Sequence, residues 1–185
     1  MPARSLTPAP APAPNPSALL AFADQAAADP ALIARLPLDP VDRTWLRIGG
    51  PGAAEAWLIG WPPGTGTGWH DHGGAVGAFL VVRGTLHEFT PPHPDVRPGR
   101  HVDVPFTPGT ETQVRLPSGS ARSFPHDHIH DVRNTSRTGH AVSLHVYSPA
   151  LSLMRRYEQT GGRLVFHSAE GTGDWDHEPE PPYRA

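Results

Sequence analysis

The chain has 185 residues, which is enough for one well-packed domain and too few for two. Its formal net charge of -3 provides no basic field, so charge argues against nucleic acid and anionic membrane as partners. No window holds the roughly 18 to 20 apolar residues of a membrane span, and the N-terminal residues lack the apolar stretch of a secretory signal. We therefore expect a cytoplasmic protein.

Cysteine is absent, which removes disulfides, thiolate metal sites and cysteine nucleophiles from consideration. Any metal site must use His, Asp, Glu or backbone oxygen. The chain contains 12 histidines, so the segments where they cluster are the places to look for ligands.

Residues 1–17 are an Ala- and Pro-rich arm that we expect to be extended and disordered, because proline removes backbone donors and fixes φ. Residues 19–37 are rich in Ala and Leu, which predicts one helix, or two short ones broken near Pro30. The acidic, proline-rich residues 171–185 form a tail that we expect to be loose.

Short apolar runs separated by Gly and Pro follow the helical segment. Their spacing of about ten residues predicts an antiparallel, all-β sandwich or barrel rather than alternating strands and helices. The candidate strands are residues 55–61, 78–82, 85–89, 100–104, 112–116, 128–132, 141–147 and 163–167. With the preceding helical segment they predict a single domain over residues 18–170.

Apolar and polar side chains alternate in residues 141–147, so one face of this strand is polar. That face carries Ser143, His145 and Tyr147. Pointing outward, they would be ordinary surface residues. Pointing into a barrel, they would line a polar cavity.

The first histidine cluster lies in GTGTGWHDHGGAVGAFLVVRG, residues 64–84. His70 and His72 are two positions apart, so on a strand both rings project from one face and can occupy adjacent positions on a metal. A histidine-rich surface loop would contain the same pair, but the flanking spacing favours a ligand pair. Gly64 lies six residues before His70, and Gly84 follows where a strand pair would turn.

The second cluster, GSARSFPHDHIHDVRN, follows the spacing G-x5-P-x4-H-x3-N and ends at Asn134. His126, His128 and His130 can share one strand face, so each is a candidate for a third ligand. We favour His130 because the proline and the asparagine of the pattern are in register with it.

These two blocks resemble the paired signature motifs of the cupin superfamily, G-x5-H-x-H-x4-E-x6-G and G-x5-P-x-G-x2-H-x3-N. The resemblance implies a cupin β-barrel, jelly-roll-like and antiparallel, with a short N-terminal helical segment. Two positions depart from the motifs, since Gly77 stands where the glutamate ligand is usual and Asp127 replaces the inner glycine. A cupin that no longer binds metal is one interpretation of Gly77.

The other interpretation is a site of three neutral imidazoles, with three coordination positions left open on the metal. Such a site has no anionic protein ligand, and it suits a substrate that brings its own anionic donor, such as a thiolate.

The resemblance narrows to the thiol dioxygenase family, the cysteine dioxygenases and their 3-mercaptopropionate relatives, over residues 40–157. It is carried by GWHDHGG, HDVRN and SLHVYSP, in that order. It implies an Fe²⁺ ion held by His70, His72 and His130.

The same resemblance implies an outer-sphere relay of Ser143, His145 and Tyr147, in which the histidine orients the tyrosine hydroxyl near the metal. Gly77 matches the bacterial members, which lack the cysteine that animal enzymes cross-link to this tyrosine. No such cross-link can form in a chain without cysteine.

The family also uses an arginine for the carboxylate of its substrate, because guanidinium and carboxylate form bidentate pairs. Arg47 precedes the first motif at about the family's spacing, and arginine at this place is a feature of the cysteine-using members. The gap is shorter than in animal enzymes, so Arg43 remains open. Arg155 or Arg156 is an alternative for a longer thiol acid, unless the two are a solvated basic pair.

The resemblance thus implies that both atoms of O₂ are added to the sulfur of L-cysteine, giving cysteine sulfinic acid. Ser148–Pro149 also matches the cysteine type, in which this bond is often cis. The alternatives are a dioxygenase for 3-mercaptopropionate or another small thiol acid, a zinc or manganese isomerase or hydrolase, and a ligand-binding cupin. We expect a monomer whose partners are a small thiol and O₂.

Overall fold

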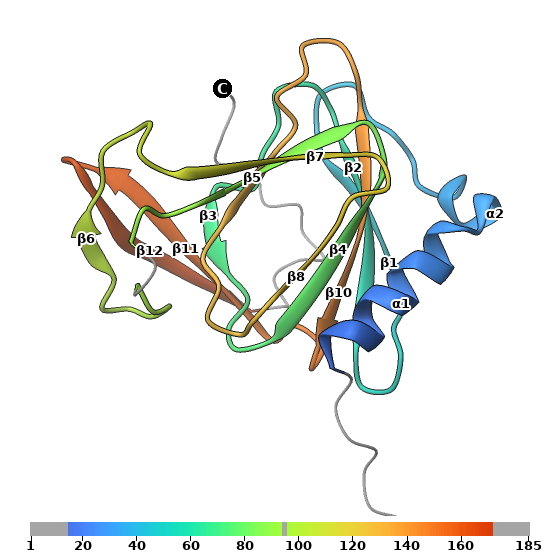
Figure 1. Ribbon diagram of the computed structural model, residues 1–185, viewed down its shortest axis with the longest axis horizontal. Coiled ribbons are helices and arrows are strands. Elements are labelled where there is room, and N and C mark those ends of the chain that lie inside the picture. The colour runs from blue at the N-terminus through green and yellow to red at the C-terminus, as the bar shows by residue number, and fades with distance from the viewer. Residues whose placement is uncertain (1–14, 94–95, 172–185) are drawn as a thin grey trace, which may run out of the picture.

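A computed structural model describes residues 15–93 and 96–171 (Figure 1). The predictions of a disordered arm over residues 1–17 and of a loose tail over residues 171–185 therefore fall almost entirely outside the described residues.

Two helices precede the strands, α1 (Pro16–Ala27) and α2 (Pro30–Ile33), so the prediction of two short helices broken near Pro30 is confirmed. The side chain of Asn15 caps α1, which begins two residues before the predicted domain boundary at residue 18. Asp29 caps α2, and Pro30 occupies its first turn, where a missing backbone donor costs nothing. Neither helix is long and apolar enough to cross a membrane, and this holds for the described residues.

Twelve strands follow in the part of the chain that the structure describes. They are β1 (Thr44–Gly49), β2 (Glu55–Trp61), β3 (Trp69–Asp71), β4 (Val76–Arg83), β5 (Thr85–Thr90), β6 (Asp103–Pro105), β7 (Thr112–Pro117), β8 (Ala121–Phe124), β9 (Asp131–Arg133), β10 (Ala141–Ser148), β11 (Leu153–Thr160) and β12 (Arg163–Gly171). Every predicted run overlaps one of these strands, whereas β1, β3, β8 and β11 were not predicted.

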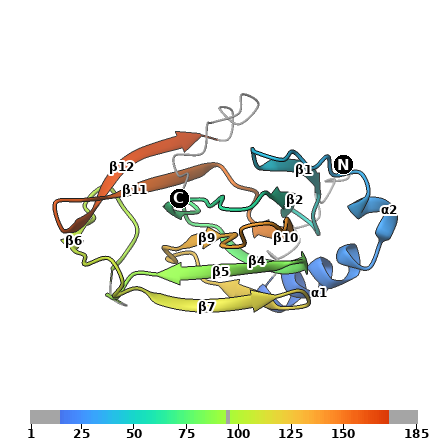
Figure 2. The ribbon, with the colours of Figure 1, turned by 90° about the horizontal axis from the view of Figure 1, so that it is seen from above.

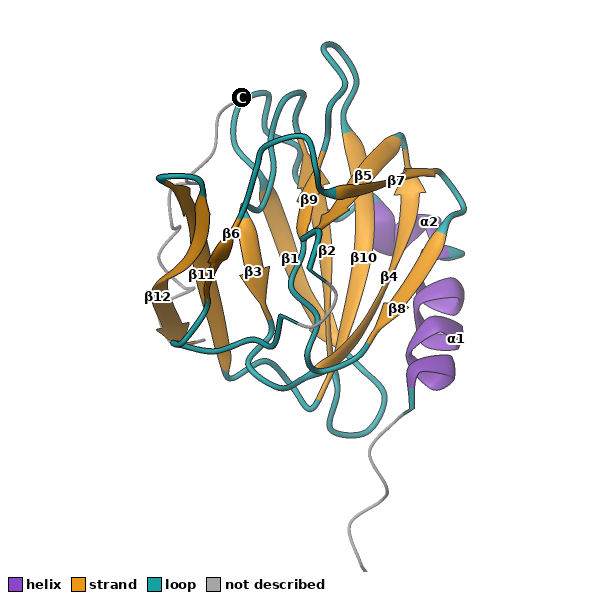
Figure 3. Cartoon of the chain, turned by 60° about the vertical axis from the view of Figure 1, so that its left-hand side comes forward, coloured by secondary structure: helices purple, strands orange, loops and turns teal. Residues whose placement is uncertain are grey.

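The strands form three antiparallel sheets that curl around a shared interior (Figures 1 and 2). Their orders are β1-β2-β10-β4-β8, β3-β11-β12-β6 and β7-β5-β9. The predicted all-β antiparallel barrel with an N-terminal helical segment is confirmed. Figure 3 shows the helices on one side of the strands.

Strand β10 lies in the middle of the five-stranded sheet and is buried on both faces. Its apolar face packs with Leu19 and Ala23 of α1 in one core cluster. Its polar face, with Ser143, His145 and Tyr147, points into the barrel, because side chains of a strand alternate between the two faces. Of the two orientations that the sequence allowed for these three residues, the inward one is therefore the one that the structure shows.

Leu144→Ala should weaken the contact between β10 and α1, because Leu144 is fully buried there. We expect the free energy of unfolding to fall by about 2–5 kcal/mol, the usual cost of this change in a core. Urea denaturation followed by circular dichroism measures it. Val41→Ala, at a position with 48% exposure, is the control and should change the value by less than about 0.5 kcal/mol. Equal losses in the two variants would contradict this packing.

Candidate metal centre

The two histidine motifs meet through a short antiparallel bridge between His70 and His130. The amide of His70 donates to the carbonyl of His130 at 2.9 Å, and the amide of His130 donates back at 3.0 Å. His72 follows two positions after His70, so its ring projects from the same face. The ring centroids of the three histidines lie 4.7 to 5.1 Å apart, and one ring nitrogen of each lies within 4.8 Å of the others.

In His70 and His130 the hydrogen bonds use the Nδ1 atoms, so the Nε2 atoms remain free to bind a metal. His70 Nδ1 donates to the carbonyl of Gly68 at 2.9 Å, and His130 Nδ1 donates to Glu88 Oε1 at 2.8 Å. His72 Nε2 is buried and has no hydrogen-bond partner among the described residues. Because buried polar atoms are rarely left unpaired, this orphan nitrogen fits a metal ligand.

Burial keeps all three imidazoles neutral. It lowers the pKa of His70 and of His72 well below the ordinary value, and the neighbouring histidines add to the effect. Burial also lowers the pKa of His130, although the hydrogen bond with Glu88 partly offsets it. Neutral imidazole is the form that binds metals, so the three residues fit a divalent ion such as Fe²⁺.

His126 and His128 do not join this group. His126 is exposed, and His128 Nε2 donates to Glu88 Oε1 at 3.0 Å. Glu88, His128 and His130 are themselves close enough to hold an ion, but hydrogen bonds between them account for the contacts. The favoured residue of the second motif, His130, is the one that the structure brings to His70 and His72.

Glu88 on β5 is a site residue that the sequence reasoning missed. Its carboxylate is 1% exposed and accepts hydrogen bonds from His130, His128 and, at 3.0 Å, Arg122. Burial alone would raise the pKa of Glu88, but the hydrogen bonds from His128 and His130 hold it well below its ordinary value. The available signal was a charged residue two positions after Leu86, on the same strand face as this buried leucine.

The predicted relay residues form a hydrogen-bonded row on β10. Ser143 Oγ lies 2.8 Å from His145 Nε2, and His145 Nδ1 lies 3.2 Å from the hydroxyl of Tyr147. The indole N–H of Trp61 donates to Ser143 Oγ at 2.8 Å. With that acceptor position occupied, the Ser143 hydroxyl can donate to His145, which then donates from Nδ1 to Tyr147. The proton of Tyr147 stays available for a ligand.

Burial sets the protonation of this row. It lowers the pKa of His145 to about 3, with further contributions from His130 and Arg43, so the imidazole is neutral. Burial also raises the pKa of Tyr147 above its ordinary value, so the phenol keeps its proton. The ring of Tyr147 lies 4.9 Å from the ring of His72, which joins the row to the histidine group.

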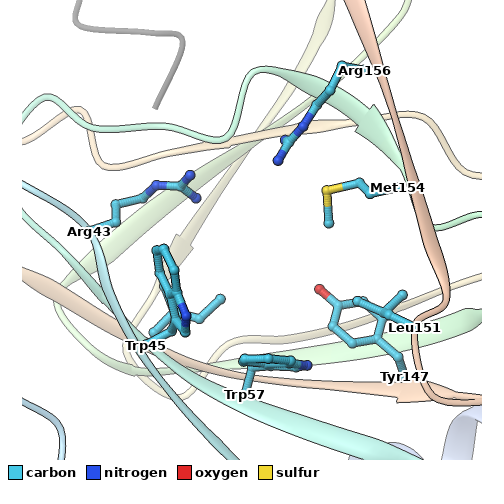
Figure 4. A pocket seen from close by; sticks show the side chains of 8 residues that line it. Arg43, Trp45, Trp57, Tyr147, Leu151, Met154 and Arg156 are labelled. Atoms are coloured by element: carbon cyan, nitrogen blue, oxygen red, sulfur yellow. The ribbon is translucent and has the colours of Figure 1, made fainter. Parts of the chain in front are cut away.

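A cavity of about 100 Å³ adjoins Tyr147. Figure 4 shows Arg43 and Arg156 pointing into it, with the hydroxyl of Tyr147 at the other side. The remaining lining is mostly apolar and comprises Trp45, Trp57, Ile59, Leu151 and Met154. The cavity therefore suits a small anionic ligand with an apolar body.

The structure brings Arg43 and not Arg47 to this cavity. Arg47 has 64% side-chain exposure and pairs with Glu55 at 2.8 Å. Arg43 directly precedes β1 and Arg47 lies four residues further along the chain, roughly 13 Å away in extended conformation, so only one can reach the cavity. Arg43 Nε is buried without a hydrogen-bond partner in the part of the chain that the structure describes. Burial and the neighbouring Arg156 lower the pKa of Arg43 to about 10, which leaves it charged at neutral pH.

The other two candidate arginines have partners. Arg156, with 13% side-chain exposure, donates to Glu170 at 3.2 Å and to the carbonyl of Thr67 at 3.1 Å, although it lines the cavity. Arg155 pairs with Asp71 at 2.7 Å and is not among the residues that line the cavity. Because both arginines are paired with carboxylates, the interpretation of Arg155 and Arg156 as a solvated basic pair is wrong.

The sequence model of the family described as cysteine dioxygenase type I matches residues 11–160. The chain belongs to this family. It is 28% identical over 127 residues to the proteins named cysteine dioxygenase type 1 of Rattus norvegicus and Homo sapiens, a match that covers 66% of the chain and 60% of those relatives. The Ser148–Pro149 bond is cis, as the resemblance to the cysteine type predicted.

Solved structures with a related outline include a cupin domain of Cnp3 from Schizosaccharomyces pombe. It is 9% identical, with a TM-score of 0.44, and the match covers 62% of this chain and 65% of that one. The TT1209 protein of Thermus thermophilus is 20% identical, with a TM-score of 0.43, over 60% of this chain and 88% of that one.

Glu88→Gln should weaken metal binding by about 10- to 100-fold, as is usual when the partner that orients a ligating histidine is lost. Anaerobic titration of the metal-free protein with Fe²⁺ or Co²⁺ measures the affinity. Glu158→Gln, at an exposed position of β11, is the matched control and should keep the wild-type affinity. Wild-type affinity in both variants would contradict the orienting role of Glu88.

The metal-free protein should lose stability as the pH falls below about 6.5, because the unfolded chain then binds a proton at His145 that the folded chain, with a pKa of about 3, does not. One such histidine contributes a slope of about 1.4 kcal/mol per pH unit. His145→Gln should reduce the slope by that amount between about pH 6 and 5 in urea denaturation. Ser143→Ala retains the buried imidazole and should retain the slope. An unchanged slope in His145→Gln would refute the assignment.

Proposed function

We propose that this chain is an iron-dependent thiol dioxygenase that adds both atoms of O₂ to the sulfur of L-cysteine and forms cysteine sulfinic acid. The proposal depends mainly on the position of Tyr147 between the histidine group and the cavity. The residue contacts a metal-ligand histidine, His72, and also lines the cavity that Arg43 and Arg156 enter. Membership of the cysteine dioxygenase type I family supports the proposal. The proposal includes a cytoplasmic, monomeric protein.

His70, His72 and His130 would hold the iron through neutral ring nitrogens. When bound, Fe²⁺ supplies a centre that gathers a thiolate and O₂, whose direct reaction is spin-forbidden. Three protein ligands with no carboxylate among them would leave room on the ion for both reactants. The neutral ligand set also favours an anionic thiolate as the incoming donor.

Arg43 would bind the substrate carboxylate. Its buried Nε lacks a partner among the described residues, and a guanidinium with a free donor is suited to a bidentate ion pair with a carboxylate. Arg156 is already engaged with Glu170 and Thr67 and adds a second positive charge to the same cavity. The small volume of the cavity favours a small thiol acid.

Tyr147 would donate a hydrogen bond to the bound ligand and keep its proton, because burial raises its pKa. His145 and Ser143 hold the phenol in place by the row of hydrogen bonds that Trp61 begins. The phenol therefore meets the reactants as a fixed hydrogen-bond donor, which is how preorganised polar groups stabilise developing charge.

The overall reaction balances without an external reductant. The thiol sulfur loses four electrons and O₂ gains them, and both oxygen atoms remain on the sulfur as the sulfinic acid. The thiol proton is matched by the proton of the sulfinic acid, which passes to solvent when the acid ionises to sulfinate at neutral pH.

A second candidate is a dioxygenase for 3-mercaptopropionate or another small thiol acid. It is favoured by Arg156, which lines the same cavity and could bind a carboxylate on a longer chain if its pair with Glu170 opened. A zinc or manganese isomerase or hydrolase and a ligand-binding cupin have the same histidines but need no redox metal.

The test is oxygen uptake by the anaerobically iron-loaded protein with L-cysteine, 3-mercaptopropionate and cysteamine, which lacks a carboxylate. We expect about one O₂ per cysteine, with sulfinate as product. Arg43→Gln should raise the KM for cysteine about 10- to 100-fold, because a charge-assisted hydrogen bond contributes about 1.5–3 kcal/mol. It should leave cysteamine turnover, if present, unchanged.

Arg47→Gln is the matched control and should behave like the wild type with cysteine. The reverse result, with Arg47→Gln impaired and Arg43→Gln normal, would contradict the carboxylate assignment. Absence of sulfinate from every thiol would refute the dioxygenase, and activity that persists with zinc in place of iron would favour an isomerase or hydrolase.

A further inference from the structure

The three ligand histidines differ in what orients them. Hydrogen bonds hold His70 and His130 through their Nδ1 atoms. The ring of His72 has no hydrogen bond among the described residues. It lies instead against two aromatic rings, Phe124 at 4.8 Å and 25° and Tyr147 at 4.9 Å and 34°.

Phe124 is the better placed of these two rings to fix His72. It ends β8, is 3% exposed and stacks on His72 more nearly in parallel than Tyr147 does. It also stacks on His128 at 5.3 Å and 20° and lies 5.1 Å from the ring of His130. One phenyl ring therefore contacts two of the three ligands and a hydrogen-bond partner of Glu88.

Gly77 makes room for this ring. It lies on β4 directly across from Phe124 of β8 on one side and from Tyr147 of β10 on the other. A Cβ atom at position 77 would lie 2.2 Å from Phe124 Cζ and 3.1 Å from Tyr147 Cδ1. The backbone of Gly77 has no positive φ, so space and not backbone conformation requires glycine here.

The position of Gly77 is also where the cupin motif carries its glutamate ligand. A side chain that starts there would overlap the ring of Phe124. The glycine and the phenylalanine thus form one steric unit, in which the ring occupies the place of the missing side chain.

We propose that Phe124 is a positioning residue of the metal centre, which fixes the His72 ring and excludes a fourth protein ligand from position 77. The inference rests on the proposed metal site. Physically, a rigid ring with two side-chain torsions locks the imidazole by contact alone. Without it, the imidazole must be ordered when the metal binds, and the affinity falls accordingly.

The positioning role is tested with Phe124→Leu, which keeps an apolar side chain and loses the ring. Fe²⁺ and Co²⁺ should bind this variant about tenfold more weakly than wild type under anaerobic titration. The visible absorption of the Co²⁺ form should also shift, since it reports ligand geometry. Phe106→Leu is the matched control, because Phe106 is 2% exposed and packs in a different cluster.

Phe106→Leu should lower the melting temperature about as much as Phe124→Leu does. Its metal affinity should stay within about twofold of the wild type, and its Co²⁺ spectrum should be unchanged. Equal affinities and spectra in the two variants would overturn the positioning role. A wild-type protein that binds neither metal would overturn the proposed function together with this role.

The steric role is tested without metal, so its outcome is separate from that of the proposed function. Gly77→Ala should lower the melting temperature of the metal-free protein by several degrees, since the methyl group must displace Phe124. In a Phe124→Ala background the same change should have little effect or raise the melting temperature. Equal decreases in both backgrounds would show that Phe124 does not fill the space at position 77.

Discussion

Two backbone hydrogen bonds between His70 and His130 join segments that lie far apart in the sequence, and the candidate centre depends on this bridge. Neither segment forms a long strand, so both need further support. On the outer side, Asp71 accepts hydrogen bonds from Arg155 and Tyr157 and ties the first segment to β11. On the inner side, Glu88 holds His130. Each carboxylate is buried and paired, so both stabilise the bridge without entering the ligand set.

The charge distribution follows from the same arrangement. Alternation along a strand turns Asp71 away from the face that His70 and His72 share, and Glu88 meets His130 on the side opposite its free nitrogen. The histidine group therefore consists of neutral imidazoles, and two guanidinium groups line the neighbouring cavity. This arrangement attracts an anionic ligand, because no carboxylate of the set competes with it.

Much of the site could be predicted from sequence, since spacing defines the histidine motifs and alternation defines the relay on β10. Other features depend on pairing across strands, which spacing does not reveal. Arg43 and Arg47 both lie at about the expected distance before the first motif, and only the location of the cavity near the start of β1 separates them. Glu88 and Phe124 gain their roles from partners on other strands. The short β3 and β8 and the polar β11 lack the apolar runs that predict strands.

The central position of β10 affects how the protein unfolds on heating. A central strand with both faces buried exchanges its amide hydrogens only when the whole domain opens. The relay on its inner face and the helix contact on its outer face thus belong to one cooperative unit. Fluctuations that loosen loops will leave the spacing of the relay intact. Heat should therefore disorder the relay only at global melting, because β10 and not a loop carries it.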